Sequence, residues 1–248
     1  SFPFRKTLWR KKMIWLFQFF KELAYSGFWN AWAVSLMKSG YTLSSASNMM
    51  AIFFLVSSFL ELPTGMLADI YGKKKITGAG ILFTGLGFAA LALGSNYSYG
   101  IIGFSMIGLG FTCVSGACTS WLISLPYIHG RESLLFNLDI LGRIANVVGT
   151  FLSILLLKTN PSWMWASLSV AAIISSLFMI NMPSDFKLGD SVKTKTVLLK
   201  IHFKKISTPI YLIFASSLFF GIESGVRNLV AQPYILELKV DEYFLAYF

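Results

Sequence analysis

Long apolar runs alternate along the chain with short polar connections. A bilayer core of roughly 30 Å needs about 20 apolar residues in a helix, and runs of that length recur along most of the sequence. Seven are present, at residues 13–37, 46–68, 76–93, 98–125, 134–157, 163–182 and 210–230. A further run begins at 243, so we expect the chain to be a portion of a longer protein. The pattern predicts an all-α protein that crosses a membrane several times.

The composition excludes other classes of protein. Hydrophobic residues make up 55% of the chain and charged residues only 13%, about half the charged share of a soluble domain. The 23 Phe, 10 Tyr and 7 Trp carry too much apolar surface for a disordered chain. The net charge of +10 comes from short clusters between the apolar runs, not from a continuous basic stripe, so no nucleic-acid partner is predicted.

The distribution of Lys and Arg predicts the orientation. If the N-terminus is cytoplasmic, the inside connections hold fifteen of these residues and the outside connections three. Cytoplasmic loops of membrane proteins are enriched in Lys and Arg. We therefore expect both the N-terminus and the Lys-rich connection 183–209 to face the cytoplasm.

The connections also divide the chain into parts. The first six runs follow one another closely, whereas residues 183–209 form a polar linker of 27 positions. We predict a six-helix domain (1–183), a basic cytoplasmic linker (184–209) and the start of a second helical domain (210–248). Segment 192–206 could form an amphipathic helix on the anionic inner leaflet or a solvated loop. Two six-helix halves joined by a long loop are the plan of a transporter.

A compact motif stands between the second and third runs, with the sequence GMLADIYGKKK from Gly65. We expect Gly65 to let a neighbouring helix approach, Asp69 to place a carboxylate at the cytoplasmic edge, and Gly72 to permit a tight turn. We expect Lys73 and Lys74 to hold the turn among the inner headgroups. The motif resembles the gating signature G-x-x-x-D-[RK]-x-G-[RK]-[RK] of the major facilitator superfamily, and its position after the second helix matches as well.

This resemblance, which extends over all 248 residues, implies a secondary transporter that works by alternating access, without a cofactor, in a bacterial cytoplasmic membrane. Ile70 stands where the family prefers a basic residue, and 102–110 lacks the Arg of many proton-coupled drug antiporters. We expect proton-coupled efflux of a small amphipathic molecule or peptide. The alternatives are an uptake carrier for a small polar solute, and a receptor or scaffold without transport activity.

Ionisable residues inside the apolar runs are candidates for proton coupling or substrate binding, because each costs roughly 2.5–3.5 kcal/mol to insert in a membrane. The candidates are Glu22, Glu61, Asp139, Arg143, Glu223 and Arg227. Two acid–base pairs are present, Asp139 with Arg143 and Glu223 with Arg227. The two members of each pair are four residues apart, so they lie on one helix face. Such pairs either serve transport or only lower the cost of burial.

Glu22 is the first choice for proton coupling. Its neighbour Lys21 points about 100° away on a helix, so we expect the two side chains not to pair. Lys21 then extends to the headgroups, and Glu22 remains as an unpaired carboxylate facing the central cavity of the fold. Glu61 either serves the same purpose or forms a hydrogen bond to a neighbouring helix.

The remaining chemistry of the sequence is sparse. Neither His129 nor His202 has Cys or carboxylate companions at ligand spacing, so no metal site is predicted. No nucleotide-binding or hydrolase signature is present, which argues against an enzyme. We predict a small-molecule substrate and a lipid bilayer as partners, and nothing implies an oligomer. Ala145, Gly149 and Ser153 form a stripe of small residues suited to close helix packing.

Overall fold

The computed structural model describes residues 2–125, 132–180 and 182, and the side chains of 12–125, 133–180 and 182. Within these ranges the secondary structure is helical, with no strand. The helices are α1 (Phe2–Lys38), α2 (Leu43–Tyr71), α3 (Lys73–Ala92), α4 (Tyr97–Ser115), α5 (Ala117–Ser124), α6 (Glu132–Thr159) and α7 (Pro161–Ile180). The predicted seventh run, the basic linker, Glu223 and Arg227 lie outside the described residues.

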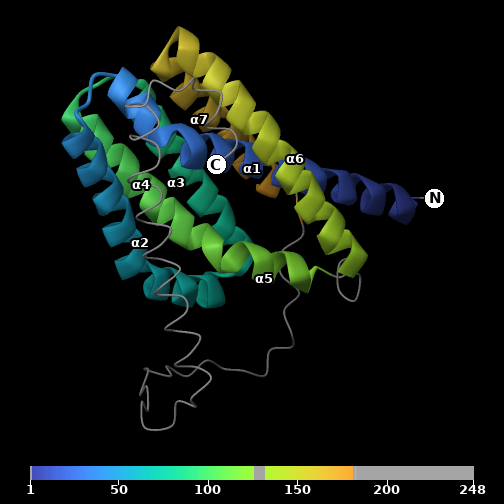
Figure 1. Cartoon of the computed structure of the whole chain (residues 1–248). Helices are drawn as coiled ribbons and strands as arrows, with labels where there is room; N and C mark the ends of the chain where they lie inside the picture. Colours follow the sequence, from blue (N-terminus) through green and yellow to red (C-terminus); the bar gives the residue numbers. More distant parts are fainter. Residues whose placement is uncertain (1, 126–131, 181, 183–248) are drawn as a thin grey trace, which may run out of the picture.

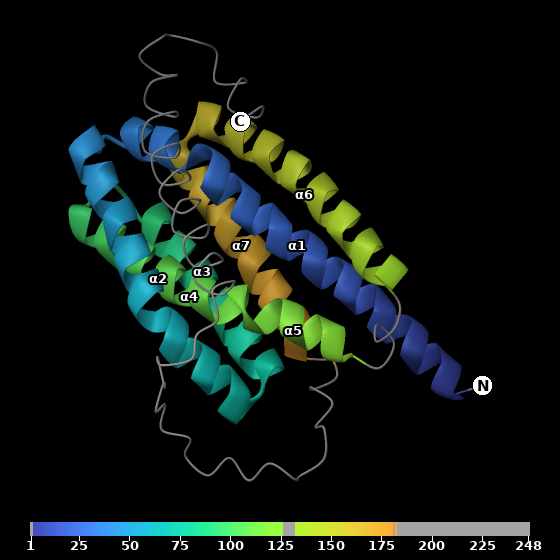
Figure 2. The same ribbon diagram turned by 60° about the horizontal axis from the view of Figure 1, so that its bottom comes forward.

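The helices form one bundle in which α1 has a central place (Figures 1 and 2). Helix α1 packs mainly against α6 and α7, α3 packs against α4 and α7, and α2 packs against α4. The connections α1–α2 and α3–α4 meet at one end, where the Tyr41 hydroxyl donates to the carbonyl oxygens of Gly94 (3.3 Å) and Asn96 (2.8 Å). The turn between α2 and α3 lies at the opposite end.

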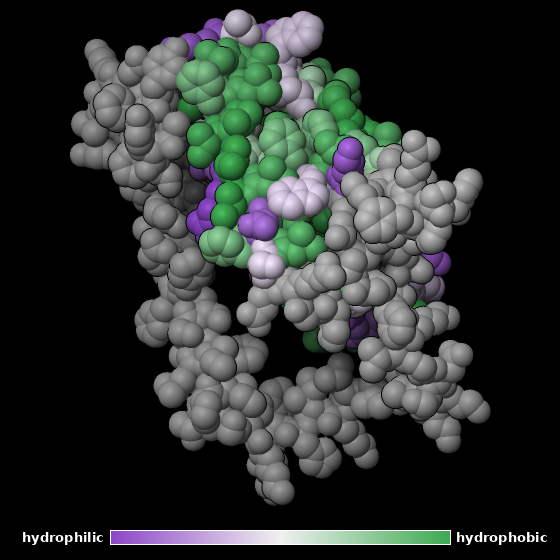
Figure 3. Space-filling view, turned by 90° about the vertical axis from the view of Figure 1, so that its right-hand side faces the viewer, coloured by the Kyte–Doolittle hydropathy of each residue, from purple (hydrophilic) through white to green (hydrophobic). Residues whose placement is uncertain are grey.

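Five segments in the described part of the chain are long and apolar enough to cross a membrane. They are α2, α3, the single segment formed by α4 and α5, α6, and α7. Helix α1 is outside this set because Lys21, Glu22 and Asn30 lower its mean hydropathy. Burial among α6 and α7 explains how so polar a helix fits in the bundle. In the coloured part of Figure 3, hydrophobic side chains form a broad area that few hydrophilic side chains interrupt. The prediction of an all-α multi-pass membrane protein is confirmed.

Glycines bring α3 and α4 into backbone contact. A Cβ atom added at Gly87 would lie 2.7 Å from the carbonyl oxygen of Gly103, and one added at Gly110 would lie 2.4 Å from that of Gly80. Both distances are far below van der Waals contact. Small residues at these positions therefore set the separation of the two helices, as is common in membranes.

Two predicted spans differ from the observed helices. The run 98–125 is divided at Gly116 into α4 and α5, and the Trp121 ring on α5 packs nearly perpendicular to the Phe17 ring of α1, with centroids 5.7 Å apart. The first helix begins at Phe2, well before the predicted start at 13. Lys and Arg are good helix formers, so the basic N-terminal residues continue the helix beyond the apolar run.

Candidate functional site

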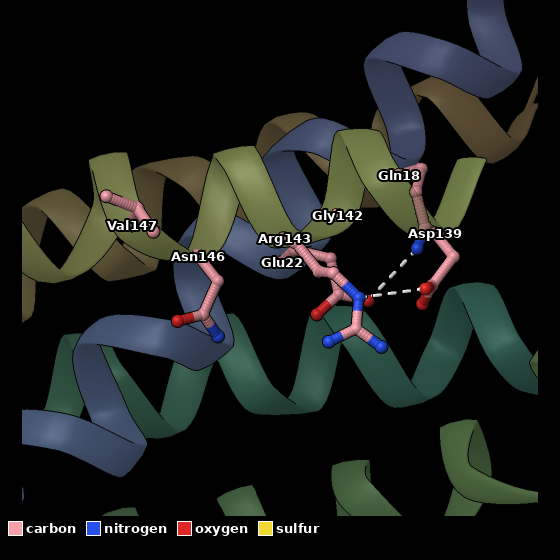
Figure 4. A pocket seen from close by; sticks show the side chains of 7 residues that line it. All are labelled: Gln18, Glu22, Asp139, Gly142, Arg143, Asn146 and Val147. Carbon is pink, nitrogen blue, oxygen red and sulfur yellow. Dashed lines mark hydrogen bonds and ion pairs between the residues drawn. The ribbon is translucent and has the colours of Figure 1, made fainter. Parts of the chain in front are cut away.

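A polar hollow lies between α1 and α6, with a volume of 420 Å³ (Figure 4). This volume falls within the range of small-molecule sites, roughly 300–1,000 Å³. Helix α1 supplies two of the lining residues and α6 the other five. The lining residues are Gln18, Glu22, Asp139, Gly142, Arg143, Asn146 and Val147.

Small residues allow α6 to approach α1 at this hollow. A Cβ atom added at Gly142 would lie 3.2 Å from Glu22 Cγ, and one added at Gly149 would lie 2.7 Å from the carbonyl oxygen of Leu23. Further along, the Asn30 side chain donates to Thr150 Oγ1 at 2.7 Å. The close helix packing predicted from the small-residue stripe is confirmed, and it holds Glu22 directly over α6.

Glu22 is paired, so the prediction of an unpaired carboxylate is wrong. Lys21 Nζ lies 2.9 Å from Glu22 Oε1, and Gln18 Nε2 donates to the same oxygen at 3.1 Å. Only 13% of the Lys21 side chain and 27% of the Glu22 side chain are exposed, so Lys21 is not an anchor among headgroups. The four methylenes of the lysine side chain are long enough to bring its ammonium group back to the adjacent helix position. Because an unpaired charge that is buried away from water is costly, burial favours the ion pair over two separate charges.

Asp139 and Arg143 form the second ion pair of the hollow, as their spacing predicts. Arg143 Nε donates to Asp139 Oδ2 at 2.9 Å. This pair is open, with 61% of the Asp139 side chain and 79% of the Arg143 side chain exposed. The accessible Asp139–Arg143 pair and the carboxylate of the largely buried Lys21–Glu22 pair therefore line one hollow, and the charges of the two pairs sum to zero.

Two amide side chains of the hollow were missed by the sequence analysis. Gln18 Oε1 is buried and accepts no hydrogen bond from any described residue, and Asn146 is exposed on α6. The signal was available, because Gln18 lies one turn before Glu22 and Asn146 lies one turn after Arg143, on the same helix faces.

Glu61 does not belong to this hollow. It is exposed on α2, and within the described ranges its carboxylate forms no hydrogen bond to a neighbouring helix, so that alternative is not supported. Glu61 and the pairs on α1 and α6 therefore lie in separate places.

The gating motif forms the turn between α2 and α3. Gly72 has φ +97° and its N–H donates to the carbonyl oxygen of Ala68 at 3.0 Å, which confirms the tight turn. Asp69 is exposed beside it. No described atom lies within 4 Å of a Cβ added at Gly65, so the helix approach expected there is absent from this part of the chain.

The motif lysines form hydrogen bonds to other helices, which the sequence analysis did not predict. Lys73 Nζ donates to Ser120 Oγ on α5, and Lys74 Nζ donates to the carbonyl oxygens of Ile180 and Met182 at the C-terminal end of α7. A cation at that end also interacts favourably with the helix dipole. The turn therefore ties α5 and α7 together at one end of the bundle.

Comparison with known proteins agrees with this arrangement. The family model of the Major Facilitator Superfamily matches residues 14–247. YxaM of Bacillus subtilis (strain 168), described as an uncharacterized MFS-type transporter, is 24% identical over 242 residues. That alignment covers 93% of this chain and 60% of the relative, so the chain spans about three fifths of the relative's length. The chain belongs to the major facilitator superfamily.

Proposed function

We propose that the complete protein is a secondary active transporter, and that the hollow between α1 and α6 is part of its substrate site. The observation that carries this proposal is the accessible Asp139–Arg143 pair in a helix of a multi-pass membrane protein. Ionisable side chains inside a membrane are costly and are characteristic of substrate and ion pathways. Membership of the superfamily supports alternating access of the site to the two sides of the membrane.

Proton coupling is proposed at Glu22. Its Oε1 accepts from both Lys21 and Gln18, so a proton on this carboxylate would weaken two interactions between neighbouring side chains of α1. A change of this kind would alter the position of α1 against α6, because Glu22 lies within contact distance of Gly142. Asp139 is the second choice, since it is accessible from the hollow.

The turn at Gly72 is proposed as the gate on the cytoplasmic side. Lys73 and Lys74 join it to α5 and α7, so a displacement of the turn would be transmitted to both helices. Asp69 is exposed at the turn and is available to a second helical domain. The positive charges of the N-terminal region and of this turn support a cytoplasmic location of both, and the membrane that we propose is the bacterial inner membrane.

The direction proposed is efflux of a small amphipathic molecule or peptide. The apolar side chain of Val147 borders the charged part of the hollow and supports a substrate with both polar and apolar parts. The two alternatives, an uptake carrier for a polar solute and a receptor without transport activity, would use the same hollow. The test below distinguishes them from efflux.

The test is flux through the full-length protein in liposomes, with an imposed proton gradient and a panel of small solutes. We expect gradient-dependent accumulation of at least one amphipathic solute. Glu22→Gln should lose accumulation against a gradient, while exchange of substrate down its gradient persists in the folded fraction. Binding without any flux would identify a receptor and contradict the proposal.

A further inference from the structure

The Arg143 guanidinium has hydrogen-bond donors that no described residue uses. Its Nε is engaged by Asp139 Oδ2, and no other interaction of the guanidinium is made by the described side chains. The two terminal nitrogens form a planar fork that fits both oxygens of a carboxylate. Asp139 therefore fixes the guanidinium through one nitrogen and leaves the fork for a ligand in the hollow.

Glu22 offers the opposite charge across the same space. Its interactions with Lys21 and Gln18 both run through Oε1, which leaves Oε2 for a ligand donor. Gln18 is only 8% exposed, and its buried Oε1 has no partner in the described ranges. Because this oxygen has almost no exposed surface, the acceptor that the hollow offers to an ammonium group is Glu22 Oε2.

The charge balance of the hollow selects the net charge of the ligand. The charged lining residues are Glu22, Asp139 and Arg143, and Lys21 balances the remaining negative charge from outside the lining through its ion pair with Glu22. An ion of either sign would therefore enter without a compensating charge. Removing an uncompensated ion from water is expensive in a membrane interior. A zwitterion has no net charge, and each of its ends meets a fixed group of opposite sign.

We infer that this hollow binds a small zwitterion, an amino acid or short peptide with a free ammonium and a free carboxylate. The carboxylate accepts from the terminal nitrogens of Arg143, and the ammonium donates to Glu22 Oε2. Val147, exposed at the edge of the hollow, contacts an apolar side chain of the ligand. This inference rests on the proposed transport site and gives the chemical class of its substrate.

The inference is tested by binding to the purified full-length protein. The zwitterionic probes are leucine, dileucine and trileucine, and the matched blocked probes are leucinamide, which lacks the carboxylate, and N-acetylleucine, which lacks the ammonium. Loss of a charged hydrogen-bonding partner corresponds to roughly tenfold or more in affinity. We expect at least one zwitterion to bind about tenfold tighter than both blocked probes. Equal binding of a blocked probe, or no binding of any zwitterion, would overturn the inference.

Variants of Arg143 assign the carboxylate end. Arg143→Gln should lower the affinity for the zwitterion about tenfold while the affinity for leucinamide stays unchanged. Arg143→Lys keeps the charge beside Asp139 but loses the planar fork, so it should show the same selective loss if the glutamine variant does not fold. Lys158→Gln is the control, because it removes a positive charge from α6 about 22 Å away. Unchanged selectivity in folded Arg143→Lys would also overturn the inference.

The outcomes separate this inference from the proposed function. Selective binding of a zwitterion without flux in liposomes would contradict transport but support the ligand class. Gradient-driven flux of another solute, with no selective binding of zwitterions, would support transport and contradict the ligand class.

Discussion

The Lys21–Glu22 pair predicts that Glu22→Gln, which replaces one carboxylate oxygen by an amide nitrogen, lowers the stability of the protein. Glu22→Gln removes the negative charge beside an ammonium group that is only 13% exposed. Removing one partner of a buried ion pair costs about 3–5 kcal/mol, and the partial exposure of Glu22 places the expected loss near the lower end of that range. If Glu22 were instead an unpaired, protonated acid, the same substitution would be almost neutral.

A second substitution isolates the pair. Lys21→Met removes the ammonium and keeps a side chain of similar length, so in the double variant no unpaired charge remains. We expect the double variant to recover to within about 1 kcal/mol of the wild type, because apolar replacement of a whole buried ion pair is often neutral. Non-additivity of this sign is expected only if the two groups interact.

The assay is thermal unfolding of the full-length protein in detergent, followed by tryptophan fluorescence. For a domain of this size, a loss of about 3 kcal/mol lowers Tm by roughly 6–12 °C. Asp139→Asn is the matched control: the same chemical change in an exposed pair should cost less than about 1 kcal/mol. A Glu22→Gln variant with the wild-type Tm, or a double variant less stable than both single variants, would refute the pairing.

Three further predictions concern packing, gating and topology. Gly110→Ala should destabilise the bundle by about 1–3 kcal/mol, because its Cβ would lie 2.4 Å from a backbone oxygen, whereas Gly116→Ala, which meets no atom within 4 Å, should change Tm little. Equal Tm values for the two variants would exclude the glycine contact. Asp69→Asn should lower the transport rate about tenfold at unchanged abundance and substrate affinity, and a normal rate would remove Asp69 from the gate. Single cysteines at Ser191 and Asn160, in a background without native cysteines, should react with a membrane-impermeant thiol reagent in intact cells only at Asn160; labelling at Ser191 would reverse the orientation.

The sequence is sufficient to predict most of the fold, because spanning helices are set by the length of apolar runs. The division at Gly116 could not be predicted in the same way, since the residues on both sides are equally apolar. The contact between α3 and α4 could not be predicted from the sequence either. Glycines spaced seven residues apart indicate a helix face, but only the structure shows which helix lies against it.

The candidate site could be predicted only in part. The Asp139–Arg143 pair follows from a spacing of four residues, which is a property of any helix. The pairing of Lys21 with Glu22 depends on the neighbours that bury both side chains, and helix geometry alone argued against it. The hydrogen bonds of the turn lysines could not be predicted for a similar reason, because their partners on α5 and α7 are distant in the sequence.

The central claim, that the hollow between α1 and α6 is a transport site open to each side of the membrane in turn, is tested most directly at Asn146. This residue lines the hollow near the middle of α6. A cysteine placed there, with Cys113 and Cys118 replaced by alanine, is exposed to a membrane-impermeant thiol reagent added to either side of sealed vesicles that contain the full-length protein. The account predicts labelling from both sides and protection from both by a transported substrate. Labelling from one side only, under every substrate and proton gradient applied, would contradict it.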